Sequence, residues 1–428
     1  MSKLQAKIQC CLLGIGQLFP WNTILTISDY YYEIFPAKFP YIIIVNNSYF
    51  FFFKWLIYYS SLRWSGKPDR NRTTNNYHPA RILALVYQPF VMGTIFTLVS
   101  RGQKSKNQGR VLAGYCLFVT GNIFLITVDL VSEAKGGLFP FLLLCFIAAS
   151  FRVANALVEG AMMGDLSCIS HDLIQPFAAG LGIAGAITSG LSLLTKAVFQ
   201  NFRDGLRKGA LLFLGISSVI EILCVVIYAL LFPKLSIVQN YQAHSISNQM
   251  ETTEVSRVLP IDNLQLAREN IYKLISLFLT YAMTLSIFPG FLFENTGKHE
   301  LNSWYPLVLI TCFNVCDALS RYTTMFKRLK MESGKWIIAC ALARVLIVPA
   351  FYFTAKYADQ GWMMFLTSFL GITNGYLTVC THTGASKKIY NLSEANSLGN
   401  MLVASMLCGI FAGACLSWLW LIGSKISF

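Results

Sequence analysis

Residues 210–232 read ALLFLGISSVIEILCVVIYALLF, an apolar run long enough to cross a lipid bilayer as one helix. A helix needs roughly 20 mostly apolar residues to span the hydrocarbon layer, and this chain repeatedly supplies that length. Hydrophobic residues make up 55% of the 428 residues and charged residues only 13%, which leaves more apolar surface than a water-soluble core can bury. The runs also lack the alternating pattern of barrel strands. The sequence therefore predicts an all-α membrane protein.

Eleven membrane spans are predicted along the chain. They cover residues 8–27, 81–100, 111–131, 138–166, 175–198, 210–232, 271–293, 304–326, 336–354, 362–382 and 395–421. The long hydrophilic interruption lies between the sixth and seventh spans. This pattern predicts an N-terminal six-helix bundle over 1–232, a cytosolic central loop over 233–270 and a C-terminal five-helix bundle over 271–428.

The stretch 37–77 is predicted to be an atypical insert rather than a twelfth span. Its apolar part would invert every later segment if it crossed the bilayer, and the loops rich in Lys and Arg would then lie outside. We therefore expect an interfacial or re-entrant excursion on the external side. A translated intron is the alternative explanation for this stretch.

The net charge of +14 is explained by topology rather than by nucleic-acid binding. The basic residues gather in short loops beside the spans, at 101–110, 327–335 and 387–388, which places these loops and the N-terminus in the cytosol. The plasma membrane is the expected location, with a vacuolar or other endomembrane as the alternative.

Charged residues inside the spans indicate where function lies. Asp317 and Arg321 are four residues apart in the span 304–326, so their side chains share one helical face within pairing distance. Each such charge costs about 2.5–3.5 kcal/mol at the bilayer centre, and is retained only against protein or a wet cavity. Asn314 lies one turn earlier on the same face. The group is either an ion pair that fixes helix packing or a polar clamp for a hydroxylated substrate, and we favour the clamp.

Two further intramembrane charges are less securely compensated. Glu159 has no basic residue three or four positions away, although Arg152 lies seven residues before it. Its alternatives are a protonated packing acid, a hydrogen-bond partner for the substrate and a carrier of a coupling proton. Arg344, in the span 336–354, is expected to reach the headgroups or to pair with an acid on another span, and is not assigned as a ligand.

Prolines and glycines mark helix breaks and close contacts. Pro20, Pro89 and Pro289 are expected to interrupt the first, second and seventh spans, where a carrier needs bends. Glycine stripes predict close helix contacts at Gly180, Gly182, Gly185 and Gly190 in one span and at Gly409 and Gly413 in the last.

No enzyme, metal or cofactor site is predicted. The cysteines contain no C-x-x-C pair, the histidines are scattered, and there is no phosphate-binding G-x-x-x-x-G-K loop. A membrane receptor or scaffold without transport activity is harder to exclude from composition, and it stays the alternative to a carrier.

Two motifs resemble the paired signatures of the equilibrative nucleoside transporters. The first is LFPWN at 18–22, and the second is FNVCDALSR at 313–321. The family pattern for the second is F-N-x-x-D-x-x-G-R, from which this chain departs only at Ser320. The stretch 77–93 and the run 29–35 are similar to the plant branch of the family in particular.

The resemblance implies a major-facilitator-like fold and a carrier that moves nucleosides, with nucleobases as a further substrate class, by facilitated diffusion or proton symport. It implies that Asp317 and Arg321 contact the ribose hydroxyls. The other substrate contacts that it implies are Trp21, Leu25, Tyr87, Glu159, Phe288 and Asn314, and the structural positions are Pro20, Asn22, Pro89, Pro289 and Ser320. Animal relatives have Gln where this chain has Glu159, so base recognition and proton coupling stay open. The implied partners are a nucleoside, the lipid bilayer and, under symport, a coupling proton, while the oligomeric state is unassigned.

Overall fold

A computed structural model describes most of the chain. The described residues are 3–27, 30–31, 34, 88–100, 107–132, 138–202, 204–241, 263–294, 301, 304–357, 359–385, 392–417 and 419–420. Within these ranges the regular elements are all helical, which confirms the predicted fold class. The predicted insert at 37–77 and most of the central loop lie outside the described residues, so neither prediction is tested.

The helices overlap all of the predicted spans. The N-terminal helices are α1 (Lys3–Thr26), α6 (Gln88–Ser100), α7 (Asn107–Ser132), α8 (Leu138–Ile169), α9 (His171–Phe199) and α10 (Gly205–Val226), which continues through the turns η2 (Ile227–Leu231) and η3 (Phe232–Lys234). The C-terminal helices are α12 (Asn263–Glu269), α13 (Ile271–Ile287), α14 (Gly290–Glu294), α15 (Tyr305–Thr323), α16 (Gly334–Ala343), α17 (Ile347–Tyr357), α18 (Gln360–Ala385) and α19 (Leu392–Ser417). The short turn η5 (Lys327–Leu329) lies between α15 and α16, and the short turn η6 (Arg344–Leu346) lies between α16 and α17.

Within the described ranges, nine helical segments are long and apolar enough to cross a membrane. Two predicted spans do not meet that standard. The described part of the second span, α6, has only 13 residues. In α15 the polar residues Asn314, Asp317 and Arg321 lower the hydropathy. The total of eleven spans therefore stays a prediction.

The structure treats the three prolines differently. α13 ends at Ile287 and α14 begins at Gly290, so the seventh span is broken at Phe288 and Pro289. The expectation for Pro20 was wrong, because α1 runs unbroken from Lys3 to Thr26. One lost backbone hydrogen bond is tolerated where neighbouring helices hold the segment in place. Pro89 is the second residue of α6, in the first turn, where a missing N–H costs little.

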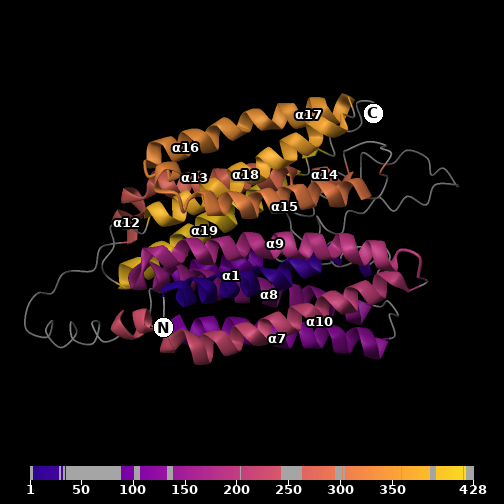
Figure 1. The fold of residues 1–428 in the computed structure, drawn as a ribbon, viewed down its shortest axis with the longest axis horizontal. Helices are drawn as coiled ribbons and strands as arrows, with labels where there is room; N and C mark the ends of the chain where they lie inside the picture. Colours follow the sequence, from indigo (N-terminus) through magenta and orange to yellow (C-terminus); the bar gives the residue numbers. More distant parts are fainter. Residues whose placement is uncertain are drawn as a thin grey trace, which may run out of the picture.

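The buried apolar residues divide between the two halves of the chain. One cluster draws only on residues between Ala6 and Val238, and another only on residues between Ile287 and Leu370. A third joins Val91 and Ala156 to residues of α13 and α19, and so crosses between the halves. Figure 1 shows α1, α7, α8 and α10 on one side and α13 to α18 on the other.

Glycines allow helices of the two halves to approach closely. A Cβ on Gly182 of α9 would lie 3.0 Å from the Cα atom of Ala318 on α15, and one on Gly164 of α8 would lie 2.9 Å from the Cα atom of Asn396 on α19. Gly409 and Gly413 pack on the backbone of α13, as the last glycine stripe predicted. The prediction for Gly190 was wrong for the part of the chain that the structure describes, where no atom lies within 4 Å of its Cβ position.

Candidate functional site

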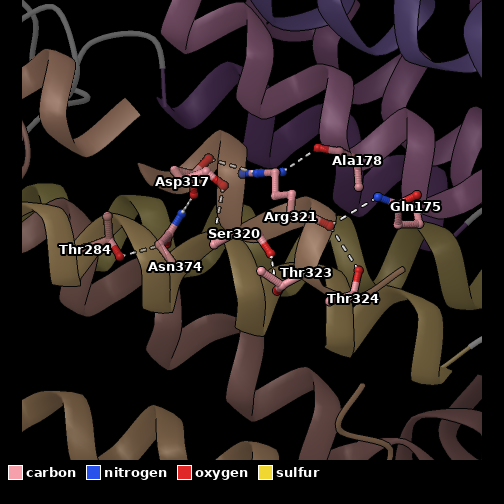
Figure 2. Close-up of polar contacts among 9 residues, drawn as sticks. All are labelled: Gln175, Ala178, Thr284, Asp317, Ser320, Arg321, Thr323, Thr324 and Asn374. Atoms are coloured by element: carbon pink, nitrogen blue, oxygen red, sulfur yellow. Dashed lines mark hydrogen bonds and ion pairs between the residues drawn. The ribbon is translucent and has the colours of Figure 1, made fainter. Parts of the chain in front are cut away.

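Asp317 and Arg321 form a buried ion pair on α15. The Arg321 Nε atom donates to Asp317 Oδ2 at 2.8 Å, and the two side chains are 5% and 7% exposed. The four-residue spacing predicted this pairing, because it places both side chains on one face of the helix. Figure 2 shows the pair at the contact of α15 with its neighbours.

Helix α9 closes one side of this ion pair. Arg321 Nη1 donates to the Ala178 carbonyl at 2.8 Å, and Gln175 Nε2 donates to the Arg321 carbonyl at 3.2 Å. Gly182 leaves room for the arginine, since a Cβ there would lie 2.7 Å from Arg321 Cδ. The guanidinium is therefore held between the two halves of the chain by bonds to both.

Helix α18 closes the other side. Asn374 Nδ2 donates to Asp317 Oδ1 at 2.8 Å, so that both carboxylate oxygens accept a hydrogen bond. Ser320, the one departure from the family motif, donates to the Asp317 carbonyl at 2.8 Å. A Cβ on Gly375 would lie 2.2 Å from Ser320 Oγ. The close contact of α15 with α18 is thus kept by a glycine on α18 instead of one at position 320.

Asn314 faces α9 rather than the carboxylate. Its Nδ2 atom donates to Ser189 Oγ at 2.6 Å, and that hydroxyl donates to the Gly185 carbonyl at 2.6 Å. Asn314 and Arg321 therefore contact the same neighbouring helix two turns apart. The sequence indicated the shared face of α15 but contained no signal for its partner helix.

Glu159 belongs to a polar group on α1 and α8. Gln17 Nε2 donates to Glu159 Oε2 at 3.0 Å and to Asn155 Oδ1 at 3.1 Å. All three side chains are buried. Gln17 and Asn155 were not predicted as site residues, although each lies four residues before a predicted one on its own helix, Trp21 and Glu159. A polar residue one turn from a candidate on an apolar helix was the signal that could have identified them.

Trp21 carries a cation on its face. The Cζ atom of Arg152 lies 3.7 Å from the centroid of the Trp21 ring, a cation–π contact between α8 and α1. Trp21 is buried, whereas Leu25 and Asn22 are partly exposed. Arg152 also interacts electrostatically with Glu159. Arg152, seven residues before Glu159, therefore interacts both with Glu159 and with the predicted residue Trp21.

The two polar groups meet around Arg321. Its guanidinium interacts electrostatically with Glu159 of α8, with Tyr281 of α13 and with His382 of α18. Tyr281 and His382 were not predicted. The structure thus brings the predicted residues Glu159 and Arg321, from separate halves of the chain, into one electrostatic group.

The remaining predicted residues lie elsewhere or outside the description. Phe288 stacks on Phe313 with ring centroids 4.2 Å apart, at the break before Pro289. Tyr87 lies outside the described residues, and so does the side chain of Pro89. A pocket lined by Tyr30, Tyr31 and Asp129 includes none of the predicted site residues.

Comparison with known proteins identifies the family. The model of the nucleoside transporter family matches residues 144–272 and 266–422. The chain is 47% identical to equilibrative nucleotide transporter 7 of Arabidopsis thaliana, over 98% of this chain and 95% of that protein. The chain belongs to the nucleoside transporter family. A second relative, equilibrative nucleotide transporter 3 of the same plant, is 46% identical over 100% of this chain and 96% of its own length.

Solved structures confirm the fold of this nucleoside transporter family member. The major facilitator superfamily transporter FucP in the outward conformation matches with a TM-score of 0.53 at 12% identity, over 98% of this chain and 92% of that one. A bacterial homologue of the iron transporter ferroportin matches with a TM-score of 0.54 at 13% identity, over the same shares of the two chains. The family match makes the chain a multi-pass membrane transporter, and the solved structures show that its fold is major-facilitator-like.

Proposed function

We propose that this transporter carries nucleosides, and nucleobases as a further class, by alternating access. The observation that carries the proposal is the buried Asp317–Arg321 pair, which lies in the family motif on α15 and contacts α9 of the other half. The pair's cost inside a membrane supports a functional role. The nucleoside transporter family supports the class of substrate.

The ribose is the part of the substrate that this pair can recognise. A carboxylate accepts hydrogen bonds from sugar hydroxyls, and a guanidinium donates to hydroxyl oxygens, so the pair offers both halves of a diol contact. In the present structure Arg321 is bonded to Asp317 and to the Ala178 carbonyl. The substrate therefore competes with the Ala178 carbonyl for the Arg321 guanidinium.

The placement of the proposed site residues on both halves of the chain supports alternating access. Trp21 and Glu159 belong to the proposed bundle 1–232, and Asp317 and Arg321 to the proposed bundle 271–428. A substrate that contacts both bundles favours the conformation in which they close around it. The energy source is the nucleoside gradient, with a proton gradient as the alternative.

Glu159 is the proposed carrier of a coupling proton. If transport requires the protonated acid, uptake by the wild-type protein rises as the outside pH falls, because more of the carboxyl binds a proton. We expect Glu159→Gln to abolish this pH dependence, since the amide cannot titrate. The measurement is labelled-nucleoside uptake by the wild type and by Glu159→Gln at outside pH values between about 5 and 8.

Glu221 provides a matched control for this prediction. It is also a fully buried acid, on α10, and it lies near Gly16, Tyr115 and Cys224, none of which is a predicted site residue. Glu221→Gln should keep the wild-type pH profile. A Glu159→Gln variant whose uptake still varies with pH as in the wild type contradicts coupling through Glu159.

The proposed orientation places the N-terminus and central loop in the cytosol and the protein in the plasma membrane, with an endomembrane such as that of the vacuole as the alternative. The excess of Lys and Arg in the loops at 101–110 and 327–335 supports this orientation.

Flux in proteoliposomes tests the proposed function. If the protein is a carrier, proteoliposomes preloaded with unlabelled nucleoside take up labelled nucleoside faster than empty proteoliposomes do. The reason is that a carrier with its site occupied returns to the outward-facing state more quickly than an empty one. A receptor or scaffold binds the label saturably without this exchange, and an enzyme converts it to another compound. Binding without exchange, or no binding at all, rejects the proposal.

A further inference from the structure

A continuous row of buried hydrogen bonds leads from Arg344 to Asp317. Arg344 Nη2 donates to Thr284 Oγ1 at 2.7 Å, Thr284 Oγ1 lies 2.8 Å from Asn374 Oδ1, and Asn374 Nδ2 donates to Asp317 Oδ1 at 2.8 Å. The row passes from η6 through α13 and α18 to α15, and its last three members appear in Figure 2. Each of its residues is at most 5% exposed.

Arg344 was expected to reach the headgroups or to pair with an acid. Snorkelling is wrong, because the side chain is 3% exposed and donates into the C-terminal helices. Its Nη1 atom donates to the Thr280 carbonyl at 2.8 Å, and its Nη2 atom lies 3.4 Å from the Leu370 carbonyl. The arginine interacts with Asp317 only through space and through the row of hydrogen bonds.

The two ends of the row agree on its direction, because Arg344 can only donate and the Asp317 carboxylate can only accept. A guanidinium has donors and no acceptor, so the Thr284 oxygen must accept from it. The single hydroxyl hydrogen then points either to Asn374 Oδ1 or to the Thr280 carbonyl, each at 2.8 Å. Because Arg344 already donates to the Thr280 carbonyl, donation to Asn374 is favoured. The Asn374 nitrogen faces Asp317, because an ionised carboxylate can only accept, and the Asn374 oxygen then accepts from Thr284.

We infer that Arg344 is a positioning residue for ribose recognition, acting through Thr284 and Asn374 on the Asp317 carboxylate. This inference rests on the proposed function and deepens it. With the amide fixed, Asp317 Oδ1 always receives a donor, and the carboxylate is held at one angle to the substrate. Without the donation from Thr284 the Asn374 oxygen loses its hydrogen bond, and the amide that donates to the carboxylate is held from the Asp317 side alone.

Thr284→Val removes the link with little change in shape. We expect the KM for uridine to rise about 3- to 10-fold, the loss associated with one buried hydrogen bond. The inhibition constant of 2′,3′-dideoxyuridine, which lacks both ring hydroxyls, should change less than about twofold, because no contact with the missing hydroxyls can be lost. Thr284→Ser keeps the hydroxyl and should restore the wild-type values.

Thr280→Val is the matched control. Thr280 is one turn earlier on α13, is 1% exposed, and its hydroxyl has no hydrogen-bond partner among the described residues. The same substitution there should leave the KM for uridine and the discrimination against the dideoxynucleoside at wild-type values. A Thr280→Val variant that behaves like Thr284→Val would assign the effect to general packing and overturn the inference.

A double-variant comparison tests the role of Arg344 itself. Arg344→Gln supplies an amide that can accept as well as donate, so it no longer imposes a direction. We expect the double variant Arg344→Gln with Thr284→Val to discriminate uridine from the dideoxynucleoside as well as the more affected single variant does. The losses do not add, because both substitutions break the same row of hydrogen bonds. Additive losses contradict the inference. Absence of uridine transport by the wild type would instead reject the proposed function and this inference together.

Discussion

Asp317→Asn is expected to reduce nucleoside uptake about 100-fold, the effect of losing one charge-assisted hydrogen bond of about 2–3 kcal/mol in a buried site. The substitution keeps the shape of the side chain but removes the charge that holds Arg321 and that would accept from the ribose. Initial uptake rates of labelled nucleoside, divided by the amount of protein at the cell surface, measure the effect without the contribution of expression.

Asp129→Asn is the control for this experiment. Asp129 also forms an ion pair, with Arg207 at 2.9 Å, but it lies among N-terminal helices, and its bonds to described residues, Arg207 and Tyr30, involve no predicted site residue. Its substitution should leave the normalised uptake within about twofold of the wild type, as expected for a partly exposed ion pair. Normal uptake by Asp317→Asn would reject the sugar clamp and leave the pair a packing device.

Gly182→Ala is the second change with a large expected effect. The added methyl carbon would lie 2.7 Å from Arg321 Cδ, 2.8 Å from Arg321 Nε and 3.0 Å from the Ala318 Cα atom. Either the arginine or the contact between α9 and α15 must shift, and overpacking of this kind costs about 1–3 kcal/mol. We expect uptake to fall about 10-fold or more as the guanidinium leaves its position.

Gly190→Ala separates this effect from a general sensitivity of α9. Gly190 is on the same helix, two turns further along, and no atom of the described residues lies within 4 Å of its Cβ position. The same substitution should therefore leave uptake and thermal stability close to wild type. Equal losses in the two variants would show that the helix, and not the arginine, accounts for the result.

The sequence predicted the parts of the fold that depend on local pattern. Apolar runs located the helices, and the spacing of Asp317 and Arg321 predicted their pairing, because both follow from the geometry of one helix. The break at Pro289 was predicted as well, but the sequence did not predict that α1 runs through Pro20 without a break. Whether a proline breaks a helix depends on the neighbours that support it, and a linear sequence does not contain them.

The site could be predicted only as separate pieces. Glu159 and Arg321 were both candidates, yet nothing in their sequence neighbourhoods indicated that α8 and α15 bring them within electrostatic range. Gln17, Thr284 and Asn374 were not identified, because single polar residues in apolar spans are common and acquire meaning from partners on other helices. The glycine stripe on α9 predicted a close contact, but only packing shows that Gly182 makes room for Arg321.

A structure determined with a bound nucleoside tests the central claim most directly. The account predicts that the ribose hydroxyls lie within hydrogen-bond distance of Asp317 and Arg321, with the base toward Trp21 and Glu159 and the Arg321 bond to the Ala178 carbonyl broken. A nucleoside bound elsewhere, with Arg321 still bonded to the Ala178 carbonyl and Asp317 closed off between α15 and α18, would contradict it.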